Sequence, residues 1–211
     1  MSMKFNSKEY EVIVIGGGHA GCEAALASSR MGAETLLITH SRETIAQMSC
    51  NPAIGGIGKG HLVKEIDAIG GEMGKVADAT GIHFRVLNAS RGAATRGSRC
   101  QSDYLEYKKV MSQKLEKQPG LMIVEGTAEL LLMRGDQVIG LRTDNNEYLA
   151  ETVIITTGTF LNGLIHRGED RVEAGSCRAV SKKTFIVTWG SVSATWKNEN
   201  RYTGTVGQEK H

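Results

Sequence analysis

The feature that most constrains the fold is an apolar run followed at once by closely spaced glycines, the stretch Val-Ile-Val-Ile-Gly-Gly-Gly-His-Ala-Gly-Cys-Glu-Ala over residues 12–24. Four consecutive apolar residues are typical of a parallel strand that is covered on both faces. Gly16, Gly18 and Gly21 fit the pattern G-x-G-x-x-G, which allows a tight turn, close approach to a pyrophosphate and close helix–strand packing. The helix that follows then offers its N-terminal N–H groups to the phosphates. The pattern predicts a dinucleotide-binding unit, and a glycine turn without a ligand is the alternative.

Composition sets the wider limits. A chain of 211 residues with a net charge of +2 can bury one core, with or without an accessory piece, and its charge does not decide for or against nucleic acid. No apolar run reaches the length of a membrane span, and the polar start has no signal-peptide core, so we expect a cytoplasmic protein. The cysteines form no C-x-x-C pair, so reduced thiols are expected and no metal site is predicted. They are Cys22, Cys50, Cys100 and Cys177.

Periodicity and turn residues predict alternating helices and strands in the first half of the chain. The strand over 34–40 ends in Thr-His-Ser and lacks the acidic residue that binds ribose in many Rossmann units. The expected elements are a helix over 19–31, a strand over 34–40, a glycine-rich loop over 48–60, a helix over 61–69, a strand over 81–87, a basic loop over 88–99 and a helix over 103–117.

The second half favours FAD over NAD. Strand-like stretches over 121–124, 127–133 and 137–143, separated by turn residues, predict a β-meander. A further strand over 152–156 leads into a second glycine turn, Thr157-Gly158-Thr159, which we expect beside the first. NAD-only Rossmann domains continue in simple βα repeats and lack an inserted meander. The fold class expected is therefore α/β, a Rossmann-like FAD-binding domain with a parallel sheet and an inserted β-meander.

The loop over 48–65 is the most unusual segment. Its glycines let backbone amides lie close to a flat ring or an anion, and Lys59 is suited to neutralise a phosphate or a carboxylate. Cys50 becomes a nucleophile if its thiolate is stabilised nearby. The alternative is that Cys50 is a small buried apolar residue.

Four stretches together resemble the N-terminal portion of the GidA/MnmG family of tRNA-uridine modification enzymes, namely residues 16–21, 48–65, 84–92 and 157–161. The resemblance covers about residues 8–175, with the Cys50–Lys59 loop as its most specific part. It implies an FAD-dependent enzyme that builds a carboxymethylaminomethyl or aminomethyl group on C5 of the tRNA wobble uridine. It also implies a folate one-carbon donor, NADH as reductant, a homodimer and the partner GTPase MnmE.

The resemblance also assigns roles to residues. It places the FAD pyrophosphate on Gly16, Gly17, Gly18, His19, Ala20 and Gly21, the adenine end near Ala128, and the second FAD turn at Thr157, Gly158 and Thr159. Cys50 matches a cysteine proposed to act near the flavin or the uridine, where attack on C6 of a pyrimidine makes C5 nucleophilic.

Basic residues offer a candidate surface for tRNA, with a solvated basic face as the alternative. The family usually has proline where this chain has Ala93, which weakens any assignment of single residues to tRNA. The candidates are Arg85, Arg91, Arg96 and Arg99, with Lys108 and Lys109 on the following helix.

Residues 176–211 no longer resemble the family. Shifted by one base, the codons of residues 196–210 permit Gly-Arg-Met-Lys-Thr-Gly-Thr-Pro-Ala-Arg-Leu-Asp-Lys-Lys-Ser, which fits the family motif G-R-x-K-T-G-T-P-x-R-L. We therefore expect that the reading frame changes near Ser176 and that residues 176–211 form a poorly ordered tail. The preceding part is then an incomplete FAD domain without the family's NADH-binding insertion and MnmE-docking domain.

Three functions stay open on these grounds. The leading one is the FAD-binding N-terminal part of the wobble-uridine enzyme, inactive alone. The second is a folate- and FAD-dependent tRNA uridine methyltransferase, against which the loop over 48–60 argues. The third is a non-enzymatic flavin- or tRNA-binding remnant.

Overall fold

The computed structural model describes the backbone of residues 5–48, 51–158, 163–167, 170–174, 185–189 and 192–196, and the side chains of residues 9–48 and 51–158. Cys50, Thr159 and Cys177 therefore lie outside the described residues. The chain divides into two compact units, residues 1–179 and residues 180–211.

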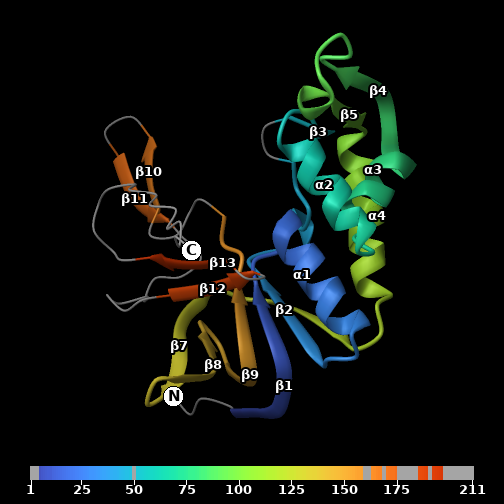
Figure 1. Ribbon diagram of the computed structural model, residues 1–211. Coiled ribbons are helices and arrows are strands. Elements are labelled where there is room, and N and C mark those ends of the chain that lie inside the picture. Colours follow the sequence, from blue (N-terminus) through green and yellow to red (C-terminus); the bar gives the residue numbers. More distant parts are fainter. Residues whose placement is uncertain are drawn as a thin grey trace, which may run out of the picture. The chain divides into compact units, whose positions relative to one another are not determined.

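The first unit contains a six-stranded sheet with the strand order β6-β2-β1-β9-β8-β7 (Figure 1). The four strands β6, β2, β1 and β9 are parallel, and β9, β8 and β7 are antiparallel. This arrangement confirms the predicted fold class. The strands are β1 (Phe5–Ile15), β2 (Thr35–Thr39), β6 (Leu121–Glu125), β7 (Ala128–Arg134), β8 (Gln137–Thr143) and β9 (Glu147–Ile155).

The meander differs from the prediction at both of its ends. The stretch 121–124 belongs to β6, which pairs in parallel with β2 instead of joining the meander. The connection through α4 (Tyr104–Glu116) places β6 there, because a strand that follows a crossover helix pairs in parallel with its neighbour. The last meander strand is β9, which pairs with β8 near its start and with β1 along its length. It is therefore shared by the meander and the parallel sheet.

Helix α1 (His19–Arg30) follows β1 and buries Cys22, Ala25 and Leu26 in the core. Met31 ends the helix and Gly32, at φ +93°, turns the chain into β2. The 3-10 turn η1 (Arg42–Thr44) lies after β2. The same core contains side chains of β1, β2 and the helices that follow, so this part of the chain is one packed body.

A second sheet, of order β3-β5-β4, lies beside α2, α3 and α4 (Figure 1). Its strands are antiparallel: β3 (Ala53–Gly55), β4 (Gly81–Leu87) and β5 (Gly97–Ser102). The prediction for β4 is confirmed, whereas β3 and β5 were expected as loop. β5 has no β-branched residue and β3 has only Ile54, so pairing with neighbours outweighs the weak local preference of both stretches. The turn η2 (Ala93–Thr95) lies in the loop between β4 and β5.

The helices of this region also differ from expectation. Helix α2 (Lys59–Ala68) begins two residues before the predicted start, and α3 (Met73–Thr80) was not predicted. The buried residues of α3 are Met73, Val76, Ala77 and Thr80, at the spacing of one helical face. That periodicity was present in the sequence, but the surrounding glycines concealed it.

Two further hairpins complete the described strands. They are β10 (Gly163–Arg167) with β11 (Asp170–Ala174), and β12 (Phe185–Trp189) with β13 (Val192–Trp196). The expectation of a poorly ordered tail falls largely outside the described residues and stays a prediction. Within the described part of the chain, no helix is both long and apolar enough to cross a bilayer.

Candidate functional site

The loop between β1 and α1 is fixed to its neighbours by backbone hydrogen bonds. The Gly16 N–H donates to the Ile38 carbonyl at 2.8 Å, which ties the loop to β2. The Gly17 carbonyl accepts from the Ala46 N–H at 2.8 Å. Gly16 has φ +107°, a conformation that favours glycine. The loop is therefore held rigidly at the carboxyl end of β1.

The space around each glycine shows why the residue is needed. A Cβ on Gly21 would lie 1.8 Å from the Gly16 carbonyl oxygen, and one on Gly16 would lie 2.6 Å from the Thr156 carbonyl oxygen. At Gly17 the added Cβ would lie 2.7 Å from Thr39 Oγ1. Gly18 differs, because nothing lies within 4 Å of its Cβ position and its φ is −72°. The fold itself does not explain glycine at position 18.

The N-terminus of α1 opens toward this free space. Gly18 is the N-cap residue and no side chain caps the helix. Gly18 and Ala20 are exposed, so the first turn presents N–H donors and the positive end of the helix dipole to the surroundings. Such a terminus is suited to bind an anion.

His19, the first residue of α1, is held in its neutral form. Burial and the positive charge of Lys59 lower the pKa of His19 to about 4. Its ring packs edge-on against the Tyr107 ring, with the centroids 5.7 Å apart. The His19 Nδ1 atom is buried and has no hydrogen-bond partner among the described residues. His19 thus adds a neutral polar group, and no charge, beside the glycine loop.

The end of β9 meets the glycine loop, as the sequence predicted for the second turn. The Thr156 N–H and Oγ1 donate to the Ile15 carbonyl at 2.9 and 2.8 Å, and Oγ1 lies 3.2 Å from the Gly16 carbonyl oxygen. Thr157 and Gly158 follow directly, and Gly158 has φ +67°. Thr159 lies outside the described residues.

Ala128 begins β7 next to the end of β2. Two contacts hold this entry in place: the Gly126 N–H donates to the Thr39 carbonyl at 2.9 Å, and Thr127 Oγ1 lies 3.3 Å from His40 Nδ1. The Ala128 side chain is buried. Ala128 therefore lies beside the carboxyl end of β2, and Rossmann units bind their ligands at the carboxyl ends of the strands.

A cavity of about 380 Å³ lies beside the start of α1 and is lined by residues of the 48–60 segment and of β5. Its charged groups are Lys59 and Arg99, with His19 as a third polar group. Lys59 Nζ donates to the Ala53 carbonyl at 3.0 Å. Partial burial, and to a smaller extent the charge of Arg99, lower the pKa of Lys59. The cavity therefore carries two cationic side chains, and neutralisation of a phosphate or carboxylate by Lys59 stays a prediction.

The described cysteines are not candidates for nucleophiles. Cys22 and Cys100 are both free and buried. Burial above all, and then the Glu23 charge, raise the pKa of the Cys22 thiol to about 12, so it stays protonated. Cys50, the predicted nucleophile, lies outside the described residues.

The basic residues predicted as a tRNA surface fall on the β4–β5 hairpin and on α4. Arg85 and Arg99 are direct cross-strand neighbours on β4 and β5, and were expected on separate elements. Arg91 and Arg96 are exposed in the connecting loop, where Arg96 Nε donates to the Arg91 carbonyl. Lys108 and Lys109 lie on α4 instead, and Lys109 forms an ion pair with Glu106 at 3.1 Å. The structure therefore pairs Arg85 with Arg99 across two strands and brings Arg91 and Arg96 together in the loop.

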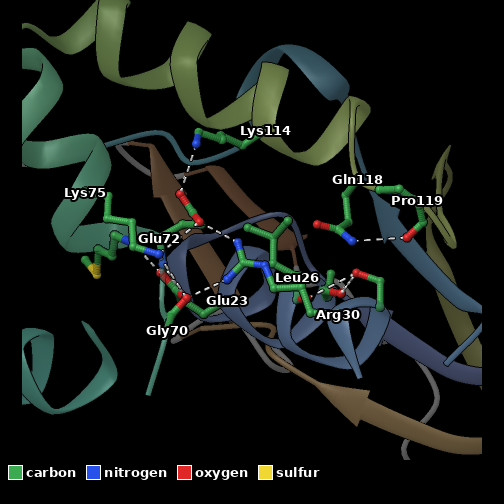
Figure 2. Close-up of polar contacts among 12 residues, drawn as sticks. Glu23, Leu26, Arg30, Gly70, Glu72, Lys75, Lys114, Gln118 and Pro119 are labelled. Atoms are coloured by element: carbon green, nitrogen blue, oxygen red, sulfur yellow. Dashed lines mark hydrogen bonds and ion pairs between the residues drawn. The ribbon is translucent and has the colours of Figure 1, made fainter. Parts of the chain in front are cut away.

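Sequence reasoning missed the polar link that joins α1 to α3 (Figure 2). The buried Glu23 carboxylate accepts the Glu72 N–H at 3.0 Å and the Met73 N–H at 2.5 Å, and thereby caps α3. Glu72 in turn binds Arg30 at 2.6 Å, with Lys75 and Lys114 at 3.5 Å. Because the partners lie about 50 residues apart, no local pattern signals this link.

Known proteins match this architecture. A sequence model of the family described as "Glucose inhibited division protein A" matches residues 11–195, which extends past the residue 175 limit expected above. The tRNA uridine 5-carboxymethylaminomethyl modification enzyme MnmG of Syntrophotalea carbinolica is 54% identical over 169 residues, covering 80% of this chain and 27% of that protein. This chain thus spans about a quarter of that relative's length.

Solved structures agree. GidA of Aquifex aeolicus, in its form II crystal, superposes with a TM-score of 0.76 at 46% identity, over 83% of this chain and 30% of that chain. The GidA-related protein from Thermus thermophilus, at 19% identity and a TM-score of 0.53, covers 77% of this chain and 59% of its own and shares the fold alone. Together with the glycine loop, the family match over residues 11–195 shows that this chain belongs to the GidA family.

Proposed function

We propose that the chain binds FAD, with the pyrophosphate on the glycine loop and the N-terminus of α1. The observation that carries this proposal is Gly18, where neither conformation nor packing requires glycine and where an added Cβ would fill the space in front of the helix. Gly16, Gly17, His19, Ala20 and Gly21 shape the same loop. The proposal also assigns the second FAD turn to Thr157, Gly158 and Thr159, and the adenine end to the neighbourhood of Ala128. FAD, when bound there, supplies redox chemistry.

The test compares two glycines that tolerate a methyl group equally well. Gly18 and Gly92 both have nothing within 4 Å of the Cβ position, and their φ values are −72° and −57°. We expect Gly18→Ala to lose flavin absorbance after FAD is added, whereas Gly92→Ala keeps it and both variants keep the wild-type unfolding midpoint. Equal flavin binding by both variants, or an unchanged protein that stays colourless with FAD, contradicts the proposal.

For the whole enzyme we propose the activity that the name of the Syntrophotalea relative states, modification of tRNA uridine at C5. Its further requirements are a folate one-carbon donor, NADH as reductant, the GTPase MnmE and a homodimer. Cys50 is the proposed nucleophile: addition of its thiolate to C6 of the uridine moves the ring electron pair toward C5, which then attacks the one-carbon unit. Loss of the C5 proton then re-forms the C5–C6 double bond and releases the thiolate. This chain, which spans 27% of that relative, is proposed to be inactive alone.

Complementation decides between the enzyme and its alternatives. The chain is expressed in a strain that lacks the enzyme, and the tRNA wobble uridine is analysed by mass spectrometry. Bound flavin without C5 modification supports the proposed FAD-binding part, inactive alone. Restored modification overturns the inactivity, and a methyl group in its place favours the folate- and FAD-dependent methyltransferase.

We also propose that residues 176–211 are read in a shifted frame. The support is the permitted string Lys-Thr-Gly-Thr-Pro in the codons of residues 199–203 and their neighbours. Sequencing the DNA across codons 170–211 tests this directly. Absence of a Thr-Gly-Thr-Pro coding string in the shifted frame refutes it, and limited proteolysis then asks whether the tail is ordered.

A further inference from the structure

The β4–β5 hairpin places two arginines where the fold alone disfavours them. Arg85 and Arg99 are register partners on adjacent antiparallel strands, so their side chains leave the same face next to each other. Like charges directly opposite each other in a strand pair are destabilising. A bound anion would offset the repulsion between the two arginines.

Two carboxylates, Asp67 and Asp78, line a pocket together with Arg85 and Arg99, but neither forms an ion pair with these arginines. Between Asp78 and Asp103 the sequence contains four arginines and no carboxylate. Among the residues that the structure describes, no ion pair joins Arg85, Arg99 or Lys59 to an acidic group. The same face also carries His83 and Gln101, the next register pair on that side of the strands. The face therefore carries several hydrogen-bond donors and two arginines without an ion-pair partner among the described residues.

Lys59 extends this charge toward the glycine loop. It shares the cavity of about 380 Å³ with Arg99 and His19, and Ala53 and Gly55 of β3 form part of the same lining. The charge of Arg99 contributes to lowering the pKa of Lys59, as expected for two cations that lie near each other without a counter-ion. The three cations Lys59, Arg85 and Arg99, which we call the cationic site, thus lead from the dinucleotide loop onto the second sheet.

We propose that the cationic site binds backbone phosphates of the RNA substrate and so brings the uridine close to the glycine loop that is proposed to hold FAD. This inference rests on the proposed tRNA substrate and adds the site at which the RNA is held. Arginine suits the task, because its planar fork donates two hydrogen bonds to one phosphate. Two arginines side by side offer such forks to one or two neighbouring phosphates.

The experiment measures binding of an unmodified tRNA transcript with uridine at the wobble position, by fluorescence anisotropy at several KCl concentrations. We expect Arg85→Gln and Arg99→Gln each to weaken binding by about tenfold and to lower the slope of log K against log salt by about one unit. Arg134→Gln, which removes an exposed arginine from the β7–β8 hairpin, is the matched control and leaves binding unchanged. All variants are first checked for flavin content and unfolding midpoint.

Each outcome has a distinct meaning. If the wild type binds tRNA and Arg85→Gln and Arg99→Gln bind it equally well, this inference alone is overturned. Absence of tRNA binding by the unchanged, flavin-containing protein overturns both the proposed substrate and this site. If the two variants lose flavin and keep tRNA binding, the cations serve the cofactor and the inference is overturned.

Discussion

The glycine loop before α1 and the β4–β5 hairpin differ in whether packing within the chain explains their residues. In the loop, the glycines at 16, 17 and 21 are required by the fold's own atoms, since a Cβ would lie 1.8 to 2.7 Å from a neighbour. In the hairpin, some residues lower the stability of the fold. Arg85 faces Arg99 across the strands, and β4 exposes apolar side chains such as Phe84, whose exposed fraction is 58%. The first region is explained by packing within the chain. For the second, we propose that a bound RNA phosphate compensates the cost of the paired arginines.

Gly21→Ala tests the role of packing in the glycine loop and has the largest expected effect on the free energy of unfolding. The new Cβ would lie 1.8 Å from the Gly16 carbonyl oxygen, and backbone cannot move aside cheaply. We expect a loss of about 4 kcal/mol or more in the free energy of unfolding, enough to unfold much of a marginally stable domain. Denaturant unfolding followed by circular dichroism measures it. Gly18→Ala is the control, and comparable destabilisation by both variants contradicts the distinction between packing glycines and the ligand glycine.

Glu23→Gln tests how firmly α1 is joined to α3. Oε1 of the carboxylate accepts the N–H groups of Glu72 and Met73, and Oε2 accepts the Glu72 N–H as well. An amide removes the negative charge and places an NH₂ donor where Oε2 faces that N–H group. We expect a loss of about 2 to 3 kcal/mol, the range for buried hydrogen bonds to a charged group. Glu151→Gln, at an exposed position of β9, is the control with an effect below about 0.5 kcal/mol. Equal effects of the two variants contradict a structural role for Glu23.

The sequence predicted the elements that depend on local patterns and missed the contacts that depend on the tertiary fold. Residues 81–87 were predicted as a strand at the bounds that β4 has, and α1 was predicted to within one residue. Both are set by local periodicity and by glycine or capping residues. By contrast, β5 is made of small and polar residues, and it exists because β3 and β4 pair with it on both sides. The Glu23–Glu72 link and the Arg85–Arg99 pair are likewise contacts that only the tertiary fold creates.

The pH dependence of stability reports on His19, where the two regions meet. Its pKa of about 4 lies below the ordinary value of 6.5, so the unfolded chain takes up a proton first as the pH falls. The stability present above pH 6.5 is thus lost as the pH falls toward 4. We expect His19 to contribute about 2 kcal/mol to the loss between pH 7.5 and pH 5.0.

Denaturant unfolding at these two pH values, for the wild type and His19→Gln, tests this prediction. The variant should lose about 2 kcal/mol less than the wild type over the same interval, whatever its stability at pH 7.5. His83→Gln removes an exposed histidine from β4 and should leave the wild-type difference unchanged. The same pH dependence in His19→Gln and the wild type shows that His19 is not held neutral.

The smallest expected effect is a gain in stability, and it tests whether the hairpin arginines are unfavourable for the fold. Arg85→Gln removes one of two like charges that face each other across the strands, so the free energy of unfolding of the protein without RNA should rise by about 0.5 kcal/mol. Raising the salt concentration should shrink this gain, because ions screen exposed charges. Arg134→Gln has no such partner across its strand pair, since Gln137 lies opposite, and should show no gain. A loss of stability in Arg85→Gln means that the arginine supports the hairpin itself, and the hairpin then follows the same rule as the glycine loop.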